Sequence, residues 1–99
     1  MGIVEDLQDC IGFDWDEGNR AKNLQKHQVS DAECEEVFFN DHLIVGRDPE
    51  HSGLEPRFFV LGRTESGREL FVVGTIRKHR IRVISARDMT KLETEAYRS

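Results

Sequence analysis

Cationic side chains in the second half of the chain are the residues best suited to carry chemistry. An arginine keeps its charge, and its planar fork donates two hydrogen bonds at once to a phosphate. A local patch of such side chains would bind an anionic polymer, although composition alone favours charges scattered over solvated faces. The candidates lie at two expected turns, on one expected strand and at the end of that strand: Arg63, Arg68, Arg77, Lys78, Arg80, Arg82 and Arg87.

The net charge of −5 conceals a division between the two halves of the chain. Residues 1–56 hold 4 Lys and Arg against 14 Asp and Glu, whereas residues 57–99 hold 10 against 5. Any contact with nucleic acid is therefore expected from the second half, as a basic patch on an acidic protein.

Arg87 has the most constrained position among these cations, at the junction between an expected strand and a terminal helix. A strand over 81–86 has period two, which places Ile81, Val83 and Ser85 on one face and Arg82, Ile84 and Ala86 on the other. An arginine at such a junction can instead pair with a nearby carboxylate. Arg77 cannot be assumed to lie beside Arg87, because successive turns of a meander alternate between the ends of a sheet.

A second group of candidates lies on a helix that is expected to run from a cap at Asp16 to about His27. Lys22 and Lys26 are four residues apart and share one face of it, with His27 adjacent in sequence. The alternative interpretation is a solvated amphipathic helix whose lysines only cover apolar surface.

The remaining pattern predicts one α+β domain over residues 1–99, with residues 1–10 as a loose leader. Ser30 and Glu33 form a capping box for a second helix, and Asp88 or Thr90 caps a last one. Short strands are expected at 11–15 and 43–45, a turn-rich loop at 47–56, and an antiparallel meander at 57–62, 70–75 and 81–86.

Several classes of protein and site are not indicated. No apolar run approaches the roughly 20 residues that span a bilayer, and the acidic start is unlike a signal peptide, so a cytoplasmic protein without membrane contact is expected. Cys10 and Cys34 form no metal-binding or disulfide pattern. His42 and His51 have no third ligand at a familiar spacing, so neither a metal site nor a cofactor is predicted.

Two blocks of the sequence form a specific combination of motifs. The first contains Phe13-Asp14-Trp15-Asp16, Asn19, Lys22, Asn23, Lys26-His27 and Val29; the second contains Gly62-Arg63-Thr64, Gly67-Arg68, Thr75, Arg77 and Ile81-Arg82-Val83-Ile84-Ser85-Ala86-Arg87. Together they resemble the BrnT family of type II toxins. The chain departs from the family at Gln28 and at Lys78-His79, where glycine is common. The change at Gln28 affects the expected end of the preceding helix, because glycine adopts the left-handed conformation of a C-cap easily and glutamine does not.

The resemblance implies a RelE-like α+β fold and a metal-independent endoribonuclease. Its partners would be RNA and a BrnA-like ribbon-helix-helix antitoxin, in a hetero-oligomer that contacts DNA only through the antitoxin. RNA cleavage of this kind uses 2′-OH attack on the neighbouring phosphorus, which needs a base, an acid and cations on the phosphoryl oxygens. We expect Arg87 and Arg77 on the phosphate, and Lys26, Lys22 and His27 in proton transfer or positioning.

Two other functions remain open. A non-catalytic module with the toxin fold could act only as the partner of a DNA-binding ribbon-helix-helix repressor. A general RNA-binding domain would retain RNA without cleaving it, with a steep dependence on salt. His27 is as consistent with a structural histidine as with a catalytic one.

Overall fold

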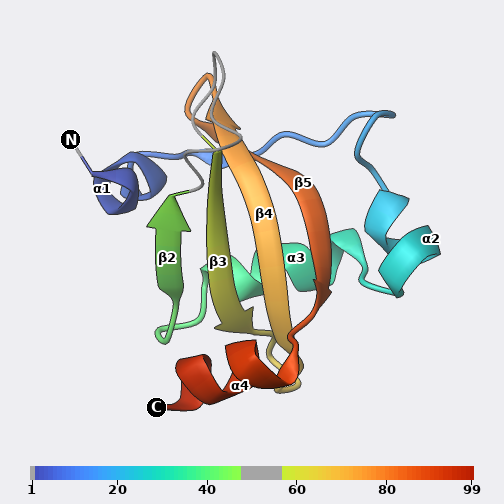
Figure 1. Ribbon diagram of the computed structural model, residues 1–99. Coiled ribbons are helices and arrows are strands. Elements are labelled where there is room, and N and C mark those ends of the chain that lie inside the picture. The colour runs from blue at the N-terminus through green and yellow to red at the C-terminus, as the bar shows by residue number, and fades with distance from the viewer. Residues whose placement is uncertain (1, 48–56) are drawn as a thin grey trace.

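The computed structural model describes residues 2–47 and 57–99, which form a five-stranded sheet with helices on both faces (Figure 1). The expected loop beyond Arg47, with His51, lies outside the described residues. In chain order the elements are α1 Ile3–Gln8, β1 Gly12–Phe13, α2 Lys22–His27, α3 Asp31–Phe38, β2 Ile44–Arg47, β3 Arg57–Arg63, β4 Glu69–Arg77, β5 Arg80–Asp88 and α4 Lys91–Arg98.

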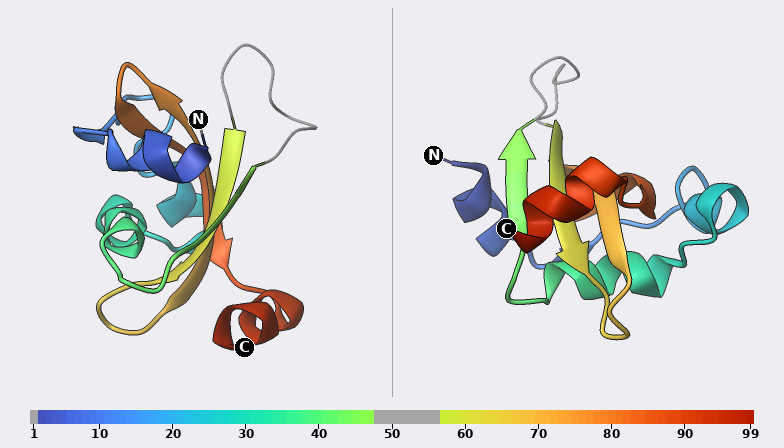
Figure 2. Two further views of the ribbon diagram at one scale, coloured as in Figure 1. Left: turned by 90° about the vertical axis from the view of Figure 1, so that its left-hand side faces the viewer. Right: turned by 60° about the horizontal axis from the view of Figure 1, so that its bottom comes forward.

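The strands follow the order β1-β5-β4-β3-β2 across the sheet. Strands β2 to β5 pair antiparallel with their neighbours, and β1 pairs parallel with β5. The predicted α+β class, the meander and the closing helix are confirmed. Helices α1 and α3 lie on one side of the sheet and α4 on the other, while α2 packs at the β5 edge (Figure 2).

The core lies between the sheet and the helices α1 and α3. Alternate residues of β3, β4 and β5 point into it, as the period of a strand requires. The segment expected to be a loose leader contains α1, whose Ile3 is buried in this core. The buried set includes Val37, Phe58, Val60, Leu70, Val72, Val83 and Ala86.

A β-bulge reverses the alternation within β5. Gly74 pairs with Val83, but the preceding residue Val73 pairs with Ser85, so Ile84 is the extra residue. The predicted faces are therefore wrong beyond Ile84, because Ala86 is fully buried on the same side as Val83. The bulge also turns Arg87 away from the core, onto the face that α1 and α3 leave open.

The predicted capping box at Ser30 is present, and Thr90, one of the two caps expected for the last helix, forms a second one. Ser30 and Thr90 each accept a hydrogen bond from the amide of the glutamate three residues later, Glu33 or Glu93, whose carboxylate accepts one from the amide of the capping residue. The helix expected to begin at Asp16 begins only at Lys22. That start was wrong because the Asp16 carboxylate accepts a hydrogen bond from the Gly18 amide at 2.7 Å, which closes a local turn.

At Gln28 and in the Lys78-His79 turn, where glycine would be expected, the backbone is left-handed, a conformation that glycine adopts easily. Gln28 ends α2 with a φ of 58°, and the two residues of the β4–β5 turn, Lys78 and His79, have φ of 53° and 61°. Two left-handed residues make a turn that matches the twist of the flanking strands. These side chains are thus held in a conformation that costs about 1–2 kcal/mol per residue relative to glycine.

No helix within residues 2–47 and 57–99 is both long and apolar enough to cross a membrane.

Candidate functional site

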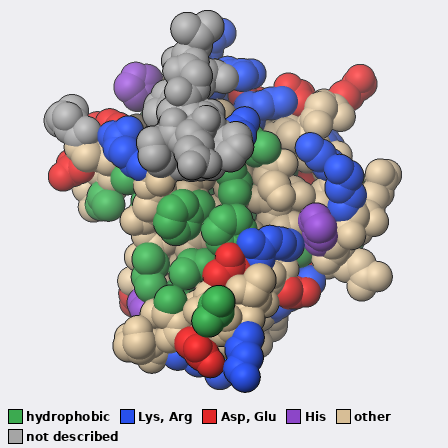
Figure 3. Space-filling view, viewed as in Figure 1, with side chains coloured by type: hydrophobic (Ala, Val, Ile, Leu, Met, Phe, Trp, Pro, Cys, Tyr) green, Lys and Arg blue, Asp and Glu red, His purple; other side chains and the backbone are tan. Residues whose placement is uncertain are grey.

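The open face of the sheet carries an aromatic patch. Phe59 on β3 and Phe71 on β4 alternate with the buried Val60 and Val72, and so point away from the core. Their rings stack with centroids 5.8 Å apart and planes 20° apart. Gly46 on β2 lets Phe59 approach, since a Cβ there would lie 2.3 Å from the ring. Apolar side chains gather in the middle of this face, above α4 (Figure 3).

Arg87 borders the aromatic patch. Its guanidinium carbon lies 4.3 Å from the centre of the Phe71 ring, within the range of a cation–π contact. Its Nη1 and Nη2 donate to the two oxygens of Glu93 at 2.8 and 3.0 Å, and Nη1 also donates to the Asp88 carbonyl at 3.1 Å. The Arg87 guanidinium is the main cause of a lowered pKa of Glu93. An incoming phosphate must therefore compete with this carboxylate.

Arg68 connects three elements beside Arg87. Its Nε and Nη2 donate to the Asp88 carboxylate at 2.7 and 3.1 Å. Its Nη1 donates to the Gln28 carbonyl at 2.8 Å and to Glu33 at 3.1 Å. Arg68 thus joins the end of β5 to the end of α2 and to the first turn of α3, which gives it a structural role.

The same connection brings His27 close to the site. The His27 carbonyl accepts a hydrogen bond from Arg68 Nη2 at 3.4 Å, and its side chain is near enough to contribute to the lowered pKa of Asp88. The main cause of that lowered pKa is the hydrogen bond from Arg68. His27 and Arg87 therefore both lie near Asp88, where the end of α2 is joined to the end of β5.

Two buried asparagines fasten α2 and its preceding turn to β5. Asn23 Oδ1 accepts from the Ala86 amide at 3.0 Å, and Asn19 Nδ2 donates to the Val83 carbonyl at 3.1 Å. They satisfy backbone groups of β5 that its short pairing with β1 would otherwise leave unpaired. The sequence reasoning missed this role, for which the only signal was two asparagines at helical spacing. Lys22 and Lys26 remain exposed on α2.

The other candidate cations are not gathered at this point. Arg77, Lys78 and Arg80 lie at the opposite end of the β4–β5 hairpin, since Arg77 pairs with Arg80 and Arg87 pairs with Phe71. Arg80 and Arg87 are seven positions apart along β5, roughly 23 Å. One phosphate therefore cannot contact both Arg77 and Arg87 in this arrangement.

Arg82 and Arg63 lie at two further places on the sheet. Arg82 donates to Asp16 at 2.8 and 3.1 Å and lies 3.6 Å from Asp14, so it fixes the segment before α2. Arg63 ends β3 close to Tyr97 of α4; burial raises the pKa of the Tyr97 hydroxyl, and Arg63 offsets part of that rise.

The arrangement suits a single strand of nucleic acid more than a small ligand. Bases stack on exposed aromatic rings, and arginine binds the phosphates between them. The described part of the open face offers the half-buried Phe59 and Phe71 beside Arg87, and α2 at the β5 edge carries exposed cations.

Comparison with known proteins agrees with this chemistry. No curated protein matches the chain. A family model described as "Ribonuclease toxin, BrnT, of type II toxin-antitoxin system" matches residues 15–93. The match spans α2, α3, the whole meander and the first turn of α4, so it includes every candidate site residue. The chain therefore belongs to the BrnT family of ribonuclease toxins of type II toxin–antitoxin systems.

Proposed function

We propose that this protein is an endoribonuclease that cleaves RNA without a metal ion, by attack of a 2′-OH on the neighbouring phosphorus, and that Arg87 holds the phosphate. The observation that carries the proposal is the position of Arg87, whose guanidinium carbon lies 4.3 Å from the centre of the Phe71 ring at the border of a half-buried aromatic patch. A base stacked on Phe59 or Phe71 would place its own phosphate within reach of Arg87.

The groups beside Arg87 would divide the remaining work. His27 and Lys26 lie at the end of α2 that Arg68 and Asp88 join to β5, and Lys22 lies one turn earlier, at the start of the helix. These three are the candidates for proton transfer or positioning. A cation close to the phosphoryl oxygens stabilises the charge that develops in the transition state. Arg77, Lys78 and Arg80 would contact the RNA further along the strand, and Arg63 at the α4 end.

The partner that would hold this activity in check is a protein antitoxin, as membership of a type II family implies. We propose a ribbon-helix-helix antitoxin of the BrnA type that forms a hetero-oligomer with the toxin in the cytoplasm. Contact with DNA would then come from the antitoxin alone.

A second function has one specific observation in its favour. Arg68, Arg82 and Arg87, all expected to bind RNA, each pair with a carboxylate in the described structure. A module that only binds a repressor would keep the toxin fold and such internal pairs. For this reason the deciding experiment must measure cleavage and not binding alone.

The experiment is incubation of the purified protein with RNA and with DNA of the same sequence, both in EDTA. We expect RNA fragments that end in a 2′,3′-cyclic phosphate and intact DNA, because DNA lacks the attacking hydroxyl. Absence of RNA cleavage, with and without ribosomes, would contradict the proposal and favour the binding module.

A further inference from the structure

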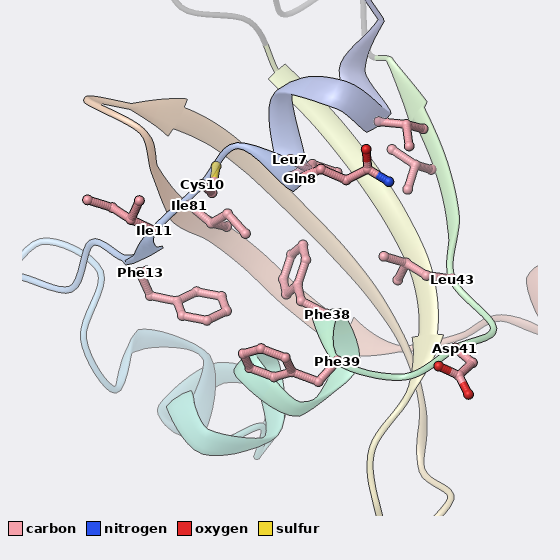
Figure 4. Close-up of a pocket in the computed structure, with 13 residues that line it drawn as sticks. Leu7, Gln8, Cys10, Ile11, Phe13, Phe38, Phe39, Asp41, Leu43 and Ile81 are labelled. Atoms are coloured by element: carbon pink, nitrogen blue, oxygen red, sulfur yellow. The ribbon is translucent and has the colours of Figure 1, made fainter.

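An apolar groove of about 560 Å³ lies on the side of the sheet opposite Arg87 (Figure 4). It runs between α1, β1, the end of α3 and the start of β2, and we call it the α1 groove. Phe13 and Phe38 contact each other edge to face within it, with ring centroids 5.6 Å apart. Leu43, just before β2, and Leu7 of α1 face them.

The α1 groove exposes large apolar side chains. The exposed fractions are 75% for Ile11, 77% for Phe39 and 49% for Val4, and these three account for most of the large exposed hydrophobics in the described chain. Apolar side chains gathered in one concavity, unlike those scattered singly, mark a surface that a partner covers.

The charge around the α1 groove restricts what that partner is. Segments 2–14 and 31–45 supply all of its lining except Ile81, and they contain nine Asp and Glu with no Lys or Arg. Asp14 and Glu33 are paired with Arg82 and Arg68, while Asp41 lines the groove itself. The basic turn of β4 and β5 reaches only the Ile11 end, where the Ile11 amide donates to the His79 carbonyl.

This charge disfavours three kinds of occupant. RNA and an anionic membrane surface would be repelled by the carboxylates, and a second copy bound face to face would oppose two acidic rims. A segment with an apolar stripe and flanking Lys or Arg would satisfy both the apolar floor and the rim.

We propose that the α1 groove is the docking site for an amphipathic segment of the antitoxin with basic flanks. This inference rests on the antitoxin of the proposed function and not on the cleavage chemistry. Helix α1 and β1 precede the residues that the family model matches, so the groove is built in part outside the family's shared pattern. A segment docked in the α1 groove would leave the open face of the sheet, with Arg87, uncovered. The antitoxin would cover that face with a different segment.

The test is a titration of the toxin with its recombinant antitoxin, followed by calorimetry. We expect Ile11→Glu and Phe39→Glu each to weaken binding at least tenfold, because each removes an apolar contact and adds a repelled charge. The matched control is Leu92→Glu on α4, whose side chain is 78% exposed outside the groove. That variant should bind like the wild type.

A second variant tests charge separately from apolar contact. Asp41 is exposed, so Asp41→Lys should leave the fold intact and weaken antitoxin binding at low salt, with a smaller effect at high salt. Thermal unfolding of every variant confirms that it is folded before binding is measured.

Two results would overturn the inference. One is unchanged binding by both groove variants together with weaker binding by Leu92→Glu, which would place the antitoxin on the α4 side. The other is a dimer of the free toxin that Phe39→Glu dissociates, which would make a second copy the occupant. RNA cleavage by the free groove variants should equal that of the wild type, so a failure of cleavage would count only against the proposed ribonuclease.

Discussion

Arg87 and Glu93 form an ion pair with two parallel hydrogen bonds, at 2.8 and 3.0 Å, and Glu93 simultaneously caps α4 by accepting from the Thr90 amide at 2.9 Å. A single carboxylate thus fixes the first turn of α4 and neutralises the arginine proposed to hold the phosphate. The position of α4 and the availability of Arg87 are therefore coupled.

Replacing Glu93 by glutamine separates these two roles. Glutamine can still complete the capping box but carries no charge to compete with RNA. We expect Glu93→Gln to bind a labelled RNA more tightly, by up to about fivefold for a partly exposed ion pair. Fluorescence anisotropy measures this, with Glu69→Gln, which breaks the separate pair to Arg98, as control. Weaker RNA binding by Glu93→Gln would show that the carboxylate itself contributes to the site.

Substitution of Arg68 should affect stability more than RNA binding. Its guanidinium bridges Asp88, Glu33 and the end of α2, and Arg68→Ala leaves those acceptors without their donor. We expect a loss of about 1–2 kcal/mol in the free energy of unfolding, at the low end of charged hydrogen bonds because Asp88 is largely exposed. Urea denaturation measures it. Unchanged stability with weakened RNA binding would instead make Arg68 a direct phosphate contact.

Acid should destabilise the protein through the same carboxylates. The pKa of Glu93 is lowered chiefly by the hydrogen bond from Arg87, and that of Asp88 chiefly by the one from Arg68. A folded-state pKa below the unfolded value means that the stabilisation is present above the ordinary value and lost as the pH falls through the folded one. The free energy of unfolding should therefore be flat near neutral pH and decrease below about 4.5, the usual value for glutamate.

The double variant Glu93→Gln and Arg68→Ala should show a smaller decrease in acid than the wild type. Denaturation midpoints measured at several pH values test this. An identical acid dependence in the two proteins would assign the effect to other carboxylates.

The β4–β5 turn offers a stabilising substitution. His79 has a φ of 61°, a conformation that glycine adopts without strain. We expect His79→Gly to raise the free energy of unfolding by about 1 kcal/mol, hence the melting temperature by about 4–8 °C. Gly67, with a φ of 93°, is the control, since Gly67→Ala should lower the melting temperature. A destabilised His79→Gly would indicate that the histidine side chain makes a necessary contact.

Local signals in the sequence predicted most of the fold. The alternation in β3 and β4, the turn at Gly67, the capping box at Ser30 and the cap at Thr90 each depend on residues only a few positions apart. The bulge at Ile84 depends on how β4 and β5 pair, and no local pattern shows it. For that reason the sequence assigned Ala86 to the wrong face.

The candidate site was predicted less completely, because its contacts join distant parts of the chain. The carboxylates that bind Arg82 and Arg68, from Asp16 and Asp88, are 66 and 20 residues away in sequence. Charge patterns identified these arginines as cations but could not identify their partners. The stacked pair Phe59 and Phe71 was likewise read only as strand residues, since stacking requires the register of β3 and β4.

The most direct test of the account is the rate of RNA cleavage in EDTA by Arg87→Ala. The matched control is Arg98→Ala, which also removes one arginine–glutamate pair but at the exposed end of α4. We predict that Arg87→Ala cleaves at least about 100-fold more slowly while remaining folded, as loss of a group that stabilises transition-state charge implies, and that Arg98→Ala cleaves like the wild type. Wild-type cleavage by a folded Arg87→Ala would contradict the account.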